Sequence, residues 1–335
     1  MKNAKVRNFK LWLLAFICAL LAFTPSGCND ALLMTSTGID SLVPKAADII
    51  RRGLADENPE IRDIAIEVVA DVQLVQLMPK VQELLKDDFV PVRFAAAMAV
   101  GDTQYHPAEN TVEKLLKDPD ENSRIAAAYA LTRLGSSDKL HILHKALASN
   151  DQTVKANAAL LLGKIGDKTA LEPLNELMKD KNSGHKVGFQ AAEAIARLGD
   201  EQIYHKLWTM LISAYADDRT MGIRAMGALG TPKAKNALII MLDDDILEVR
   251  LAAAEQLGRL KDTTGEPEVL DVFSKNLTVG LDKEDRERAN VLTALAIGQI
   301  HTPALTKFLP RLLKDDSKRV RLAAAKAVFQ GKTAN

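Results

Sequence analysis

The sequence predicts an all-α fold, an α-α superhelix made of about nine stacked helix pairs. Three observations lead to this prediction. Alanine and leucine are abundant, whereas aromatic residues make up only 4% of the 335 residues, which favours short, closely packed helices over β-sheet. A fourteen-residue segment recurs along the chain. Each copy follows a leucine-rich amphipathic stretch, which indicates a repeated unit of two helices.

The repeated segment reads DDFVPVRFAAAMAV at 87–100, DDILEVRLAAAEQL at 244–257 and DDSKRVRLAAAKAV at 315–328. Looser copies align with these on the residue that follows the valine, and the aligned residues are 31 to 38 positions apart. The nine aligned positions are Arg62, Arg93, Arg124, Lys155, Gly188, Arg219, Arg250, Arg288 and Arg321. A repeat of this length indicates one helical hairpin stacked many times.

Each unit is expected to hold two helices with different surfaces. Stretches such as MPKVQELLKD and LEPLNELMKD carry apolar residues three and four apart and predict the first helix. A turn rich in Asp, Asn and Pro follows and caps the second helix. Numbered from the aligned residue, positions −1, +3, +4, +7 and +10 of that helix form one apolar stripe. Glycines at +11 predict its end, at Gly135, Gly166, Gly199 and Gly230.

The motif D-x-x-x-V-R-x-A-A-A occupies Asp88–Ala97, Asp245–Ala254 and Asp316–Ala325. It resembles the HEAT repeat, in particular the bacterial HEAT-like type of phycobilisome lyases. The resemblance implies a HEAT-like solenoid over residues 41–335, and it specifies fold far more than function. It also implies a structural ladder between acidic turn residues and basic helix residues of successive units, involving Asp88, Arg93, Arg124, Asp245, Arg250, Asp316 and Arg321.

In HEAT-type folds the second helix of each unit lines a concave binding face. Position +5 points away from the buried stripe, and position +9 lies beside it. An apolar row with cations at its rim is expected to bind a protein or peptide partner. The alternative is that a register error of one residue places the same side chains in the core. The candidate surface consists of Met98, Tyr129 and Leu160, with Arg133, Lys164 and Arg197 beside them.

The amino terminus has the pattern of a signal peptide, expected to cover residues 1–27. Four basic residues precede an apolar run at 11–23, which is too short to span a bilayer as a helix. The following sequence, PSGC, is similar to a bacterial lipobox, although Pro25 replaces the usual aliphatic residue. This similarity implies cleavage before Cys28 and lipid attachment to its sulfur.

The predicted mature protein is therefore attached to a membrane at the bacterial cell envelope, with residues 28–40 as a linker to the repeats. A soluble secreted or periplasmic protein and an uncleaved membrane anchor remain alternatives. The balanced charge, 44 basic and 44 acidic residues, argues against nucleic acid as a partner.

The sequence carries little sign of catalysis, and no cofactor or metal is expected. His141 and His144 are three residues apart on a predicted helix but have no apparent third ligand. The acidic run at 243–245 lacks the spacing of a calcium loop and is expected to cap a helix. We expect a non-enzymatic protein-binding scaffold. A bilin-lyase-like or other enzyme subunit and a cytoplasmic adaptor are the alternatives.

Fatty-acid labelling tests the predicted lipid attachment. The wild-type protein is expected to incorporate labelled fatty acid and to fractionate with membranes, because a multiply acylated cysteine anchors a protein stably. Cys28→Ser should lose the label and the membrane association together. Label retained in Cys28→Ser, or a soluble wild-type protein, would contradict the prediction.

Overall fold

The computed structural model describes residues 38–180 and 182–333. The predicted leader and Cys28 lie outside the described residues. The chain divides into two compact units, Met1–Ser41 and Leu42–Asn335. Every regular element within the described residues is an α-helix or a short 3-10 helix, which confirms the predicted all-α fold.

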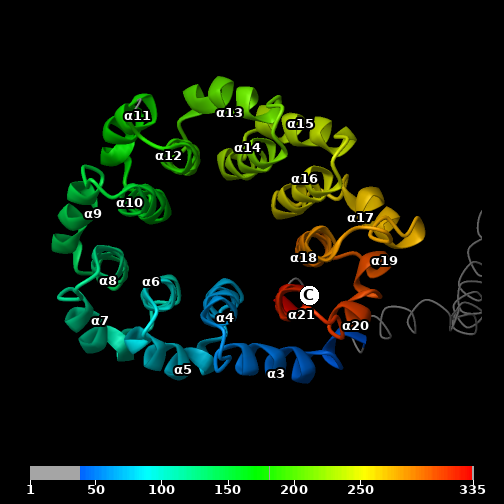
Figure 1. Cartoon of the computed structure of the whole chain (residues 1–335), viewed down its shortest axis with the longest axis horizontal. Coiled ribbons are helices and arrows are strands. Elements are labelled where there is room, and N and C mark those ends of the chain that lie inside the picture. The colour runs from blue at the N-terminus through cyan, green and yellow to red at the C-terminus, as the bar shows by residue number, and fades with distance from the viewer. Residues whose placement is uncertain (1–37, 181, 334–335) are drawn as a thin grey trace, which may run out of the picture. The chain divides into compact units, whose positions relative to one another are not determined.

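The unit from Leu42 to Asn335 has an outer and an inner layer of helices (Figure 1). The outer helices are α3 (Val43–Gly53), α5 (Met78–Glu83), α7 (Glu109–Leu115), α9 (Leu140–Ala146), α11 (Leu171–Lys179), α13 (Tyr204–Leu211), α15 (Pro232–Ile240), α17 (Glu266–Ser274), α19 (Pro303–Thr306) and α20 (Leu309–Leu312). The inner helices are α4 (Pro59–Asp71), α6 (Val90–Asp102), α8 (Glu121–Arg133), α10 (Gln152–Ile165), α12 (His185–Arg197), α14 (Ala216–Leu229), α16 (Leu247–Arg259), α18 (Lys283–Ile300) and α21 (Lys318–Thr333).

Small side chains allow neighbouring inner helices to pack closely. A Cβ atom added to Gly101 of α6 would lie 2.9 Å from the Tyr129 ring and 3.0 Å from the Cα atom of Ala130 on α8. A Cβ atom on Gly163 of α10 would lie 2.8 Å from the Cα atom of Ala194 on α12. Bulkier residues at these glycines would push the helices apart. The alanine- and glycine-rich composition of the inner helices therefore sets their spacing.

Eight inner helices end with a residue of positive φ, eleven positions after the aligned residue. The predicted glycine caps are confirmed in four of them, and Gln, Lys or His takes this conformation in the others. The last of these caps, His301, shows that Asn290 and not Arg288 is the aligned residue of the eighth unit. The prediction of Arg288 is wrong because the charged segment DKEDRER contains several basic residues, whereas the equivalent position two residues later is occupied by asparagine. The caps are Gln73, Gln104, Gly135, Gly166, Gly199, Gly230, Lys261 and His301.

A ladder of ion pairs connects successive units. The guanidinium group of Arg62 makes two hydrogen bonds of 2.8 Å with the carboxylate of Asp87, in the turn of the next unit. The same group donates to the carbonyl of Asp56 in its own turn, at 2.8 Å. Each such arginine therefore binds two consecutive turns. The other pairs of this kind are Arg93–Asp118 at 3.0 Å and Arg219–Asp244 at 2.8 Å.

The acidic partners differ from the expected ones by one residue. Asp87 and Asp244 provide the carboxylates of the ladder, because the first acidic residue of each turn lies between two units and the second points outward. Asp88 accepts a hydrogen bond from Arg93 through its carbonyl. Asp245, 84% exposed, contacts Arg219 at 3.2 Å, and the carbonyl of Asp316 accepts from Arg321.

Two of the expected basic residues bind backbone carbonyls instead of a carboxylate. A third binds the carboxylate of a helix residue instead of that of a turn residue. Arg124 donates to the carbonyls of Asp118 and Pro119 in its own turn. Arg321 donates to the carbonyls of Asp315 and Asp316. The carboxylate that pairs with Arg250 belongs to Glu268 of α17, at 3.0 Å.

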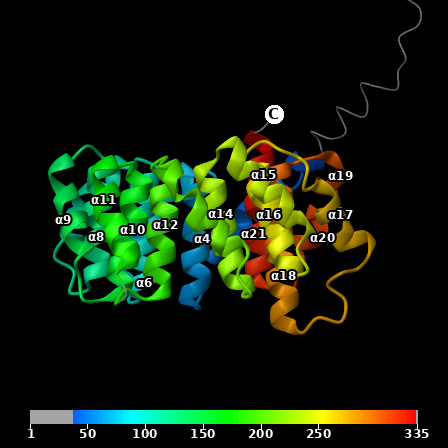
Figure 2. The same ribbon diagram turned by 90° about the horizontal axis from the view of Figure 1, so that it is seen from above.

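The predicted solenoid of helix pairs is confirmed, and the stack closes into a ring within this unit. The last inner helix, α21, packs against α3 and α4 of the first pair, and the inner helices surround a central opening in Figure 1. Figure 2, turned by 90°, shows the helices of both layers upright beside one another. We call the contact of α21 with α3 and α4 the seam.

Ion pairs and apolar contacts hold the seam. Lys318 bonds Asp56 at 2.6 Å, and Lys326 bonds Asp71 at 2.5 Å. Leu322 lies so close to Gly53 that a Cβ atom there would be 3.1 Å from its side chain. In its turn, Asp56 holds the place that Asp87 holds in the next unit. Lys318 of the last unit therefore pairs with Asp56, the first carboxylate of the ladder.

Shortening a seam side chain tests the closure. Leu322→Ala is expected to lower the free energy of unfolding by about 3 kcal/mol, because a fully buried leucine leaves a cavity. Hydrogen exchange should become faster in α21 and also in α3, at the opposite end of the sequence.

Leu131→Ala in α8 is the control, because Leu131 is equally buried but distant from the seam. Repeat proteins open locally, so its effect should appear in α6, α8 and α10. Unchanged exchange of α3 in Leu322→Ala would show that the ring is open in solution.

Candidate binding site inside the ring

The inner helices enclose a cavity of about 850 Å³, which we call the lumen cavity. All nine inner helices contribute residues to its lining. Four of the six candidate surface residues lie in this lining, Met98, Leu160, Lys164 and Arg197. The structure therefore brings most of the expected surface together, inside a closed ring instead of along an open face.

Tyr129 was expected on this surface, and that expectation is wrong. Its side chain is only 1% exposed and its hydroxyl donates a hydrogen bond to the carboxylate of Asp102. Burial and the charge of Asp102 raise the pKa of Tyr129, so the phenol stays protonated. The glycine at position 101 explains the error, because α8 approaches α6 there and covers the ring. Arg133, one turn after Tyr129 on α8, is half-buried and does not line the cavity.

Polar contacts cross the lumen side of α8. The ammonium group of Lys164 on α10 bonds the carboxylate of Asp102 on α6 at 2.7 Å, so the two helices that flank α8 are connected directly. The amide of Asn157 donates to the amide oxygen of Asn122 at 2.9 Å. These contacts fix the side chains at the wall, and a preorganised wall loses little entropy when it binds a ligand.

An apolar patch lies on one side of the lumen cavity. Phe94 and Met98, four residues apart on α6, and Leu160 of α10 are partly exposed there. Phe94, at position +1, was not among the predicted surface residues, which came from positions +5 and +9 only. Residues four apart share a helix face, so the position of Met98 could have identified Phe94.

A cationic cluster lies on the helices α12 and α14. Arg197 and Arg224 bond the carboxylate of Glu193 at 2.7 and 3.2 Å. Burial raises the pKa of Glu193, but the charges of Arg224, Arg197 and Arg259 outweigh it and hold the pKa below its usual value. Three guanidinium groups thus surround one buried carboxylate. The side chain of Arg224 is 57% exposed and can bind an additional acceptor.

Two carboxylates on α4 lie in the lumen cavity without an ion pair among the described residues. Burial and the charges of Glu67 and Glu60 raise the pKa of Asp63 to about 7. Burial and the charge of Asp71 also raise the pKa of Glu67, although Lys326, Lys164 and Arg224 act against it. Nothing in the repeat pattern identifies these two carboxylates as a pair that shares one enclosed space.

The described residues carry little that is suited to metal binding or membrane insertion. Their His, Cys, Asp and Glu side chains form no cluster of three that could hold a metal ion. His144 bonds Asp167 at 2.6 Å, while His141 bonds the carbonyl of Asp138, so the two histidines have separate partners. No helix in residues 38–180 or 182–333 has the length and apolar content needed to cross a bilayer.

The carboxyl of Asp63 is expected to make stability depend on pH. It titrates near pH 7 in the folded protein and near its usual 3.8 when unfolded. The folded state therefore binds the proton more tightly, and the free energy of unfolding falls as the pH rises between these values. Asp63→Asn removes the ionisable group and with it this fall in the free energy of unfolding. It should raise the melting temperature at about pH 8 and change it little at about pH 4.

The control for this prediction is Asp88→Asn, which removes an exposed carboxyl outside the lumen cavity. Its effect on the melting temperature is expected to be small at both pH values. If Asp63→Asn melts at or below the wild-type temperature at the higher pH, the folded protein does not disfavour ionisation of Asp63.

Several solved structures are similar to this chain at low sequence identity. Human deoxyhypusine hydroxylase is 18% identical over 79% of this chain and 99% of its own, with a TM-score of 0.39. The phycocyanin lyase complex of CpcE and CpcF from Nostoc is also 18% identical, over 74% of this chain and 93% of its own, with a TM-score of 0.42. Importin beta is 16% identical over 88% and 48% of the two chains, with a TM-score of 0.37.

No curated protein sequence matches the chain. The family model for HEAT repeats matches three overlapping segments, residues 77–155, 140–222 and 207–293. Together these segments cover more than half of the chain, from the start of α5 into α18. The chain therefore belongs to the family of HEAT-repeat proteins.

Proposed function

We propose that this HEAT-repeat protein is a non-enzymatic scaffold that binds a peptide segment of a partner protein in the lumen cavity. The observation that supports this proposal most directly is the lining of that cavity. It combines the apolar patch of Phe94, Met98 and Leu160 with exposed charged groups. Its volume, about 850 Å³, lies within the range of ligand pockets.

The wall of the cavity suits recognition of a preformed shape. Each inner helix packs against an inner helix on both sides, so no helix of the wall is free to move alone. A rigid wall reduces the entropy lost on binding. The partner segment gains affinity by burying apolar side chains against Phe94, Met98 and Leu160, since apolar burial provides most of the favourable free energy in such contacts.

The charges of the cavity favour a segment that carries both signs. Arg224 lies on one side of the lumen and the carboxylates of Asp63 and Glu67 lie on α4. Acidic groups of the partner pair with the arginine, and basic groups pair with the carboxylates. Such pairs add specificity more than affinity.

The proposed location is the bacterial cell envelope. Support for it comes from the signal-like leader and the lipobox-like PSGC sequence that ends at Cys28. A lipid on Cys28 would hold the ring near a membrane surface, and the ring would capture proteins that pass there.

Site-specific photo-cross-linking in cells tests the proposal. Benzoylphenylalanine placed at Met98 is expected to form an adduct with a discrete partner. Phe94→Asp in the same chain should abolish the adduct, because the charge disrupts apolar contact at the same patch. If the ring holds its partner at a membrane, the adduct should be found in the membrane fraction.

The same photoreactive residue at Val75 is the control, because Val75 is 46% exposed and lies outside the lumen cavity. No adduct is expected there. Identical adducts from Met98 and Val75, or an adduct that survives Phe94→Asp, would rule out the lumen cavity as the binding site.

A further inference from the structure

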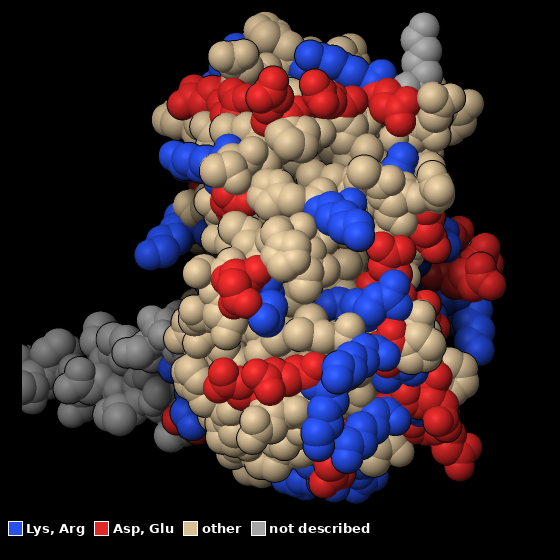
Figure 3. All heavy atoms as spheres, turned by 90° about the vertical axis from the view of Figure 1, so that its left-hand side faces the viewer, with Lys and Arg blue, Asp and Glu red and all other residues tan. Residues whose placement is uncertain are grey.

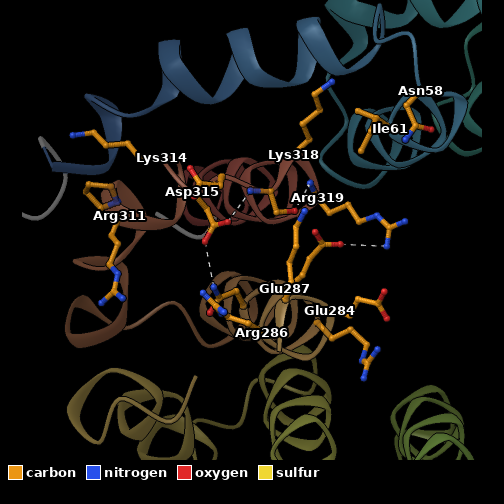
Figure 4. A pocket seen from close by; sticks show the side chains of 16 residues that line it. Asn58, Ile61, Glu284, Arg286, Glu287, Arg311, Lys314, Asp315, Lys318 and Arg319 are labelled. Carbon is orange, nitrogen blue, oxygen red and sulfur yellow. Dashed lines mark hydrogen bonds and ion pairs between the residues drawn. The ribbon is translucent and has the colours of Figure 1, made fainter. Parts of the chain in front are cut away.

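A second and larger cavity lies at the seam, and it shares no residue with the lumen cavity. We call it the seam cavity. Its volume is about 1640 Å³. Residues from α4, α18 and α21 and from the segment 310–317 line it. Figure 4 shows Asn58 and Ile61 toward one end and Arg311 with Lys314 at the other.

The lining of the seam cavity is strongly charged, with seven basic residues and four acidic ones. Its apolar part is small, since Ile61 and Pro310 are the only aliphatic residues in it. Recognition in this cavity must therefore depend on charge and hydrogen bonding. The excess of positive charge favours an anionic ligand.

Three of the seven cations already have acidic partners. Lys318 bonds Asp56 at 2.6 Å, Arg319 contacts Glu287 at 3.4 Å and also Glu60, and Arg288 contacts Asp285. The other four have no carboxylate within 4.0 Å among the described residues. These four are Lys283, Arg286, Arg311 and Lys314.

Arg311 and Lys314 lie at the end of the cavity away from Asn58 and Ile61, and Arg286 lies between them and Glu287 (Figure 4); we call this side of the cavity its basic end. All three residues are exposed. Arg286 donates to the carbonyl of Leu281 at 3.1 Å, and Arg311 lies over the ring of Phe273 at 5.8 Å. These contacts position the guanidinium groups but leave their charge without a counterion.

Asp315, one of the four acidic residues of the lining, has other partners. Asp315 accepts hydrogen bonds from the amide of Asn290 at 3.2 Å and from the backbone of Ser317 at 2.9 Å. Its carboxylate therefore connects α18 to the start of α21 through these hydrogen bonds. The cations of the basic end thus remain available to a ligand.

We propose that the seam cavity binds an acidic peptide segment. A cavity of this volume exceeds the usual range for small ligands, and several separated cations fit successive carboxylates along an extended chain better than one compact anion. Arginine binds carboxylates through two parallel hydrogen bonds, so Arg286 and Arg311 each provide a specific contact.

Binding there is coupled to closure of the ring. The lining includes residues of α4 from the first unit and of α18 and α21 from the last two. A peptide that contacts both sides of the seam binds the closed ring more tightly than an opened one, and it stabilises the closed ring by that difference in affinity.

Binding of a fluorescent octaglutamate peptide tests the proposal. The peptide is expected to bind with an affinity that falls as salt increases. The variant Arg286→Glu/Lys314→Glu should weaken binding about tenfold, as expected for the loss of two partly exposed ion pairs. Bound peptide should also slow hydrogen exchange in α3 and α21, because a ligand at the seam stabilises the contact between these helices.

The matched control is Lys145→Glu/Lys168→Glu, which changes the net charge equally. Both lysines are exposed and belong to the side of α9 and α11, where basic and acidic side chains are interspersed in Figure 3. This variant should bind octaglutamate nearly as tightly as the wild type. Circular dichroism and melting temperature should show that both variants fold.

Three outcomes would overturn the proposal. One is the absence of octaglutamate binding at about 1 mM peptide, the weak end of specific recognition. Another is an equal loss of affinity in the two variants, which would mean that only net charge matters. The third is tighter binding of an oligonucleotide of equal charge, with the same dependence on Arg286 and Lys314, which would identify a nucleic-acid site instead.

Discussion

Each helix pair of this ring buries its apolar stripe only by packing against the next pair, and every other feature depends on this contact. The inner helices carry alanine or glycine where they meet, so their backbones lie close together, as at Gly101 and Gly163. Close packing excludes water from the contact and covers the apolar stripe. In an open stack the first and last pairs would each leave one stripe exposed. Closure at the seam covers both.

Polar contacts between the units add to the apolar packing. The turns between outer and inner helices carry buried polar groups, which need partners. In three units one arginine satisfies two turns, as Arg62 does with the carbonyl of Asp56 and the carboxylate of Asp87. At the seam Lys318 takes the place of this arginine. The ion pairs between units therefore include one from the last unit to the first. Gly188 interrupts the ladder in the fifth unit, where Arg224 of α14 connects the unit to the next one through Glu193 of α12.

The helical repeat could be predicted from the sequence, since alanine runs, capping residues and glycine stops repeat with one period. Its finer geometry could not. Tyr129 follows the same pattern as Met98 and Leu160, yet a glycine on the adjacent helix buries it. Closure depends on the sum of small rotations between units, which no single motif encodes. Asp63 and Glu67 become an enclosed acidic pair only because the ring surrounds them. Arg288 was aligned in place of Asn290 because an insertion shifts the unit.

The contact between Lys318 and Asp56 has a consequence for how such a protein changes over generations. Open repeat arrays lengthen and shorten freely, because a duplicated or deleted module still finds neighbours of the same kind. A circle has no such freedom: one module more or fewer alters its circumference, and the terminal partners no longer meet. The closed geometry thereby fixes the number of repeats, whereas residues within modules and loops such as the one that precedes α18 can change without altering the circumference.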